Sequence, residues 1–117
     1  MKIILDTNFL VDCVRFKIDM LKELAGNEIY TIESVFQELH KIAERNTKDA
    51  QIAKISLKIA SELEVLPSKE RETDDSMLVY SKEGYVIATQ DSVLKGRIKD
   101  AGGKFVYIRQ RKYFVFE

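Results

Sequence analysis

Short apolar runs alternate along the chain with longer segments whose apolar residues recur every three or four positions. Compact runs rich in Ile, Val and Leu are typical of strands that are covered on both faces. Alternating strands and helices predict an α/β fold with a parallel, doubly wound sheet of about five strands. The expected strands are Lys2–Leu5, Glu28–Thr31, Glu64–Leu66, Tyr85–Ala88 and Lys104–Ile108.

Helical spacing is clearest between the second and fourth of these runs. A helix is expected from about Ser34 to Glu44, because Ser34 is followed three residues later by Gln37 in the reciprocal capping pattern. A second helix is expected further on, where apolar residues step by 3, 4 and 4 positions and should form one buried stripe. That stripe consists of Ile52, Ile55, Ile59 and Leu63.

Composition narrows the classes of protein that this pattern allows. The 117 residues carry 19 basic and 19 acidic side chains, so the net charge gives no general attraction to nucleic acid. This length predicts one domain over residues 1–117. No apolar run approaches the ~20 residues that span a bilayer, so we expect a cytoplasmic protein without a membrane partner.

The scarcity of sulfur and imidazole ligands limits the chemistry further. The single cysteine, Cys13, excludes an internal disulfide and a Cys-rich zinc site, and we expect it to be a small buried residue rather than a nucleophile. The single histidine, His40, excludes a His-rich metal site. Carboxylates should therefore carry any chemistry that the protein performs.

Two aspartates follow strands of the expected sheet, at the edge where such sheets bind ligands. Asp6 comes directly after Lys2–Leu5 in an Asp-Thr-Asn turn, and Asp91 follows the fourth strand in Thr89-Gln90-Asp91-Ser92. Each aspartate has a simpler alternative role as the N-cap of the helix that comes next.

A glutamate lies at the border of a buried helix face. Glu38 is three residues after Val35 and four before Ile42, which places it beside the apolar stripe rather than on the solvated side. Glutamate is rarely buried unless it is paired or bound to a cation. The alternative is an edge residue whose carboxylate extends to solvent.

Two further acids open a later helix. Asp74 and Asp75 follow Thr73, a candidate N-cap, ahead of the helical segment Ser76–Lys82. Acids in a first turn also complement the helix dipole, which is the alternative interpretation. Asp75 shares a helix face with Leu78 and Val79, so we expect it to point towards the sheet more than Asp74 does.

These acids are expected to converge at one edge of the sheet. Like charges a few ångströms apart repel and raise each other's pKa, so such a cluster needs cations. Mg²⁺ or Mn²⁺ accepts hard oxygen ligands, and two ions ~3.5–4 Å apart can serve an in-line phosphodiester displacement.

Taken in order, these residues resemble the PIN-domain ribonucleases over nearly the whole chain. The resemblance rests on Asp6-Thr7-Asn8 after the first strand, Glu38 in a Gln-Glu-Leu helix, Asp74-Asp75 opening a later helix, and Thr89-x-Asp91 after a strand. It implies a three-layer α/β/α sandwich and an endoribonuclease that depends on Mg²⁺ or Mn²⁺ and acts on single-stranded RNA. By the same resemblance Asp6, Glu38, Asp75 and Asp91 are the catalytic acids and metal ligands, Asp74 is a further metal ligand, and Asn8 and Thr89 support them.

The resemblance leaves the biological role open. The segments from Ala88 to Lys99 and from Tyr107 to Tyr113 look like the archaeal and eukaryotic PIN proteins of small-subunit ribosomal RNA processing, which implies a ribosome-assembly partner. The VapC toxins share the acids but usually lack such a basic ending, and they imply an antitoxin partner. A third alternative is a non-catalytic PIN module that binds RNA or protein.

Other α/β classes fit less well. A phosphate-accepting receiver domain needs an aspartate at the end of the third strand, where Val65-Leu66 runs into Pro67. A phosphatase with an Asp-x-Asp nucleophile is excluded because position 8 is Asn.

The C-terminal part of the chain is strongly basic. Between Lys95 and Lys112 there are seven basic residues and one acid, Asp100. Tyr113 and Phe114 offer aromatic surfaces for base stacking. An alternative for the segment Tyr113–Phe116 is an edge strand or the contact of a homodimer. The candidate RNA-binding residues are Lys95, Arg97, Lys99, Arg109, Arg111 and Lys112.

Overall fold

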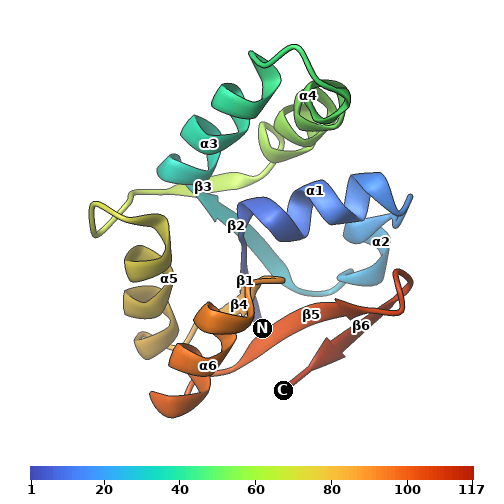
Figure 1. Ribbon diagram of the computed structural model, residues 1–117. Coiled ribbons are helices and arrows are strands. Elements are labelled where there is room, and N and C mark those ends of the chain that lie inside the picture. The colour runs from blue at the N-terminus through green and yellow to red at the C-terminus, as the bar shows by residue number, and fades with distance from the viewer.

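A computed structural model describes residues 1–117 and contains one six-stranded sheet between two layers of helices (Figure 1). The strands are β1 (Lys2–Leu5), β2 (Glu28–Ile32), β3 (Glu64–Leu66), β4 (Val86–Ala88), β5 (Phe105–Arg109) and β6 (Tyr113–Phe116). The helices are α1 (Thr7–Arg15), α2 (Met20–Glu23), α3 (Glu33–Ala43), α4 (Lys48–Ala60), α5 (Thr73–Lys82) and α6 (Ser92–Asp100). The predicted α/β sandwich is confirmed.

The sheet has one strand more than expected. Its order is β3-β2-β1-β4-β5-β6, and β1 to β5 pair in parallel whereas β6 pairs antiparallel with β5. Tyr113–Phe116 is thus an edge strand. The chain reverses before it through Gln110 and Arg111, whose φ angles are 54° and 57°. This turn contains no glycine, so the sequence carries no strong signal for the hairpin.

The strand order contains a switch point between β1 and β4. The connections from these two neighbouring strands run to opposite sides of the sheet. From β1 the chain continues to β2 and then β3, while from β4 it continues to β5 on the other side. Ligands of open α/β sheets bind at the carboxyl ends of such a pair. Asp6 follows β1 and Thr89 follows β4, so the predicted site residues lie at this switch point.

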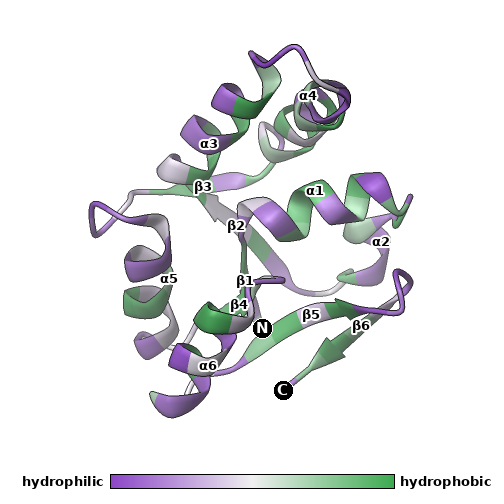
Figure 2. Ribbon diagram, viewed as in Figure 1, coloured by the Kyte–Doolittle hydropathy of each residue, from purple (hydrophilic) through white to green (hydrophobic).

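The two helical layers contain different helices (Figure 1). Helices α1, α3 and α4 pack against one another, and α5 packs against α6 in the other layer. Figure 2 shows both hydrophobic and hydrophilic positions on each helix, while β5 and β6 are mostly hydrophobic. Ile3, Ile4 and Leu5 of β1 are wholly buried, as the compact apolar run predicts. No helix combines the length and the apolar character needed to cross a membrane.

The buried face of α4 differs from the predicted stripe. Ile55 is 44% exposed, so the expectation of one buried isoleucine stripe is wrong. The helix instead turns small residues inward, and it packs against both α3 and α1. Small side chains let helices approach closely, and they carry no hydrophobic signal that periodicity would detect. The buried residues of α4 are Ala50, Ala53, Ser56 and Ala60.

Two predicted helix starts are also corrected. Helix α3 begins at Glu33 with Ile32 in the N-cap position and no side-chain cap, so Ser34 and Gln37 do not form a capping box. The Ser34 hydroxyl oxygen instead lies 3.0 Å from Thr73 Oγ1, within hydrogen-bonding distance. Thr73 is the first residue of α5 rather than its cap. Both hydroxyls therefore serve contacts between helices.

Candidate active site

A cavity of about 390 Å³ lies at the carboxyl ends of β1 and β4. Residues of α1, α3 and α4 line it together with the residues at the starts of α5 and α6. The wall contains six carboxylates and two guanidinium groups, an excess of four acids. The charged lining residues are Asp6, Asp12, Glu38, Asp49, Asp74, Asp91, Arg15 and Arg45.

Asp6 is the most buried acid of the cavity. It is 4% exposed and caps α1, where its Oδ1 accepts a hydrogen bond from the Thr7 amide at 2.9 Å. Its Oδ2 accepts from Thr89 Oγ1 at 2.8 Å. Burial raises the pKa of Asp6 to about 7, the two hydrogen bonds oppose that rise, and the negative charges of Asp74 and Glu38 add to it. The cap and the cavity position are therefore both real features of this residue.

Asn8 and Thr89 join the start of α1 to the end of β4. Thr89 is wholly buried, and its Oγ1 also accepts from the Asp91 amide at 3.1 Å. Asn8 Oδ1 accepts from the Gln90 amide at 2.9 Å. Gln90 extends this link, because its Oε1 accepts from the Ile108 amide of β5 at 2.7 Å. Sequence reasoning did not single out Gln90, which lies beside recognised residues but has no charge.

Asp91 uses one carboxylate oxygen for capping and leaves the other free. Its Oδ1 accepts from the amides of Val93 at 2.9 Å and Leu94 at 3.0 Å, which makes it the N-cap of α6. Its Oδ2 takes part in no hydrogen bond of the protein. Because a carboxylate has about four acceptor positions, capping does not prevent Asp91 from binding a ligand in the cavity.

Glu38 connects the first residues of two helices. It is half-buried on α3, beside the wholly buried Val35 and Leu39. Its Oε2 accepts from Oγ1 of Thr7, the first residue of α1, at 2.7 Å. Its Oε1 accepts from Oγ1 of Thr73, the first residue of α5. These two hydroxyls hold the carboxylate within the cavity rather than in bulk solvent.

The order of the neighbouring acids on α5 is the reverse of the expected one. Asp74 lines the cavity, where burial and the charges of Asp91 and Glu38 raise its pKa. Asp75 is 47% exposed and forms a 2.8 Å ion pair with Arg97. The reason is helical geometry, since Asp74 precedes the wholly buried Met77 by three residues and therefore shares its face.

A second cavity of about 360 Å³ borders the first. Its lining includes Asp75 and Arg97, and it shares Glu38 and Asp74 with the first cavity. Arg97 is the one predicted RNA-binding residue that lines either of them. The two cavities therefore adjoin each other where Glu38 and Asp74 line both of them.

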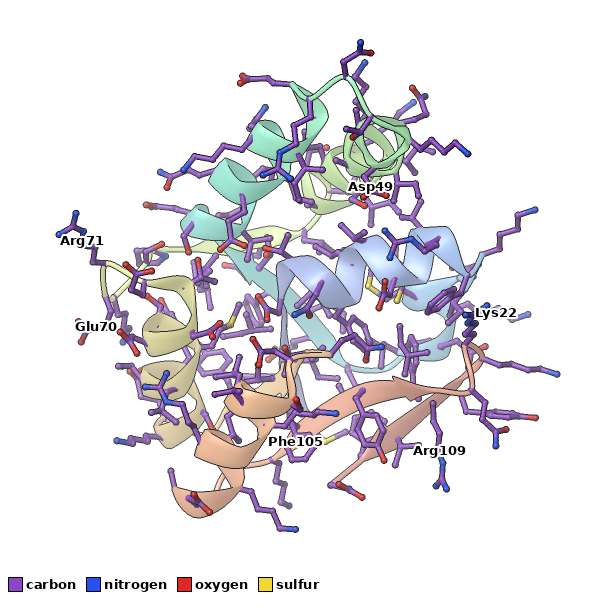
Figure 3. The ribbon with its side chains drawn as sticks, in the orientation of Figure 1. Lys22, Asp49, Glu70, Arg71, Phe105 and Arg109 are labelled. Atoms are coloured by element: carbon purple, nitrogen blue, oxygen red, sulfur yellow. The ribbon has the colours of Figure 1, made fainter.

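The other basic residues of the C-terminal part lie elsewhere on the surface. Lys95 Nζ is 4.3 Å from the centre of the Tyr107 ring, and Arg111 lies over the ring of Phe16. Arg109 points away from α1 and from Asp49 in Figure 3. Lys99 and Lys112 are exposed and line neither cavity. Their role in RNA binding stays a prediction.

Charged residues that sequence reasoning missed form one wall of the first cavity. Arg15 Nη1 binds Asp12 at 2.6 Å, and Nη2 binds Asp49 of α4 at 3.1 Å. Asp12 and Arg15 are three residues apart on α1, a spacing that predicts an ion pair. No sequence pattern predicted that Asp49 or Arg45 would reach the same cavity.

The chemistry of the cavity suits a hard divalent cation. Its charged ligand atoms are carboxylate oxygens, which Mg²⁺ and Mn²⁺ prefer, and its excess of acids needs positive charge. The side chains are spread more widely than ligation requires, because no three Asp, Glu, His or Cys side chains are grouped closely enough to hold one ion. The donor types and the charge fit a cation, whereas the spacing of the side chains does not form a closed coordination site.

The fold and the carboxylate-lined cavity define an α/β/α sandwich domain with an acidic centre at the switch point of its sheet. A family model described as "PIN like domain" matches residues 3–111, and the chain belongs to this family. Ribonuclease VapC4 of Methanocaldococcus jannaschii is 28% identical to it, over 97% of this chain and 94% of that protein. The resemblance to PIN-domain ribonucleases is confirmed, and the VapC branch is represented by a relative.

A solved structure has the same fold. It is described as a domain of a functionally unknown protein from Methanocaldococcus jannaschii DSM 2661. The TM-score is 0.70 with 20% sequence identity, and the match covers 92% of this chain and 91% of that chain.

Proposed function

We propose that this protein is an endoribonuclease that hydrolyses phosphodiester bonds of single-stranded RNA with Mg²⁺ or Mn²⁺ bound in the acidic cavity. One observation carries the proposal: acids from four separate parts of the chain line a single cavity at the switch point. These are Asp6 after β1, Glu38 on α3, Asp74 on α5 and Asp91 before α6. Membership of the PIN-like family and the likeness to a ribonuclease support it.

The same four acids are the residues that would hold the cation. A divalent cation supplies Lewis acidity and lowers the pKa of an attacking water. In the reaction the water oxygen attacks phosphorus, the bond from phosphorus to a ribose oxygen breaks, and that oxygen takes up a proton. Asp74 takes the place that sequence reasoning gave to Asp75, while Asp75 would act indirectly through its ion pair with Arg97.

The supporting residues act on the orientation of the acids. The hydrogen bonds from Thr89 and the Thr7 amide fix both oxygens of Asp6, so its remaining lone pairs have a defined direction. The hydroxyls of Thr7 and Thr73 do the same for Glu38. Such prior positioning reduces the reorganisation that substrate binding would otherwise require.

For the biological role we favour a VapC-type toxin, with an antitoxin as partner. The support is the likeness to Ribonuclease VapC4 over nearly the full length of both chains. A role in ribosomal RNA processing, with a ribosome-assembly partner, rests on the basic C-terminal part alone. A non-catalytic module that binds RNA or protein is the second candidate function, and the wide spacing of the carboxylates favours it.

The test is cleavage of labelled single-stranded RNA by the purified protein in Mg²⁺, in Mn²⁺ and in EDTA. We expect cleavage with either cation, none with EDTA, and a loss of at least about 100-fold in Asp6→Asn, a change that preserves the helix cap. Circular dichroism would show that the variant is folded. Cleavage by Asp6→Asn at the wild-type rate would place the active site elsewhere. RNA binding without cleavage in any cation would favour the non-catalytic module.

A further inference from the structure

Arg45 is the unpaired cation of the acidic cavity. It lies in the turn between α3 and α4 and lines the same cavity as Asp6 and Asp91. It forms none of the four ion pairs of the protein, whereas Arg15, the other arginine of the cavity, forms two. Both terminal nitrogens of Arg15 are engaged, so its guanidinium already neutralises Asp12 and Asp49. The guanidinium of Arg45 is available to an incoming anion.

Arg45 and Arg97 line two adjoining cavities. Arg45 lines only the first cavity and Arg97 lines only the second, and the two cavities share Glu38 and Asp74. The two hollows therefore form one trough, in which Arg45 lines the first hollow, Arg97 lines the second, and Glu38 and Asp74 line both. Arg97 pairs with Asp75 through Nη2 alone, so its guanidinium, unlike that of Arg15, keeps a terminal nitrogen for a further partner.

The acids of this trough repel the phosphates of an RNA strand that enters it. Its phosphates carry negative charge, and the acids of the first cavity outnumber its arginines by four, an excess that one divalent cation would only partly neutralise. The phosphates next to the reacting one need positive partners outside the acidic centre. Arginine suits that role, because its planar group donates two parallel hydrogen bonds to a phosphate.

We propose that the trough binds a single RNA strand across the acidic centre, and that Arg45 holds a phosphate on the side of the α3–α4 turn while Arg97 holds one on the side of α6. This inference rests on the proposed function and names the residue that positions its substrate. Of the six predicted RNA-binding residues only Arg97 takes part in this contact, because the other five line neither cavity.

The experiment measures binding of a short, fluorescein-labelled single-stranded RNA of mixed sequence to wild type, Arg45→Ala, Arg45→Lys and Arg71→Ala. Arg71 is the matched control, since it is exposed, unpaired and outside both cavities, and Figure 3 shows it pointing away from the body of the protein. Fluorescence anisotropy in EDTA would give Kd over a range of salt concentrations. Cleavage in Mn²⁺ would be measured on the same variants.

For Arg45→Ala we expect Kd to rise about three- to tenfold and the slope of log K against log salt to become shallower by roughly 0.7, the value for one phosphate contact on a single strand. Arg45→Lys should keep the slope, and Arg71→Ala should match wild type. Equal affinities and slopes in Arg45→Ala, Arg71→Ala and wild type would overturn the inference, even if wild type cleaves RNA. Absence of cleavage by wild type would instead refute the proposed function, and the binding data would still decide the role of Arg45.

Discussion

The Thr89 hydroxyl donates a 2.8 Å hydrogen bond to Asp6 Oδ2, and both groups are buried at the switch point of the sheet. The contact joins residues 83 positions apart in the sequence. It is also one of the two hydrogen bonds that oppose the effect of burial on the Asp6 pKa. The acidic centre is therefore built around a carboxylate that the fold holds in place at an energetic cost.

Replacing Thr89 by Val keeps the shape of the side chain but removes that hydrogen bond and the one that Thr89 Oγ1 accepts from the Asp91 amide. We expect the free energy of unfolding to fall by about 1–3 kcal/mol at neutral pH, because a buried carboxylate loses a donor. Urea denaturation would measure it. Thr89→Ser should recover most of the loss, and the effect of Thr89→Val should shrink in an Asp6→Asn background. An equal loss in both backgrounds would show that the contact does not act through Asp6.

The stability of the metal-free protein should fall as the pH rises from about 4 to about 7. Burial raises the pKa of Asp6 from 3.8 to about 7, so in this range the folded state binds a proton that the unfolded state has lost. Relative to Asp6→Asn, the wild type should lose roughly 2–4 kcal/mol across the range and then level off. Denaturation in EDTA at a series of pH values would show this. A difference between the two proteins that does not change with pH would contradict it.

Divalent cations should stabilise the folded protein. The proposed function requires Mn²⁺ to bind the folded protein, where the acids are assembled, and not the unfolded chain, so millimolar Mn²⁺ should raise the wild-type Tm by mass action. Asp91→Asn should respond less because it removes a charge from the cavity. Asp100→Asn, at the far end of α6 and outside both cavities, is the control and should respond like wild type. Equal shifts in both variants would point to a cation site elsewhere.

Cys13 should be unreactive while the protein is folded. The side chain is 2% exposed, and burial raises the pKa of its thiol to about 12. The thiolate is the reactive form, so labelling by a thiol reagent near pH 8 should be at least about 100-fold slower in the native protein than in denaturant. Rapid labelling of the native protein would show that the helical layer around α1 opens readily.

The site positions that could be predicted are those next to strands. Asp6 directly follows β1 and Asp91 comes three residues after the end of β4, and a parallel sheet brings the ends of its strands to one edge. It was harder to predict which acid of α5 lines the cavity, because successive residues of a helix point in directions about 100° apart. The predicted face of α5 favoured Asp75, whereas the buried face that contains Met77 brings Asp74 to the cavity.

Other features leave a weak local trace in the sequence or none. The segment Tyr113–Phe116 was recognised only as an alternative edge strand, because β6 follows a turn without glycine, and the buried face of α4 consists of small residues. Arg45 lies in a turn between two helices, where no periodic pattern constrains its position. Its approach to Asp6 depends on how α3 and α4 pack against α1, which is a property of the assembled fold.

The most direct test of the acidic cavity as the active centre compares two neighbouring residues of α5. RNA cleavage in Mn²⁺ would be measured for wild type, Asp74→Asn and Asp75→Asn, with the fold of each checked by circular dichroism. Because Asp74 lines the cavity and Asp75 pairs with Arg97 outside it, Asp74→Asn should lose at least about 100-fold in rate and Asp75→Asn less than about threefold. Full activity in Asp74→Asn together with a large loss in Asp75→Asn would contradict the account.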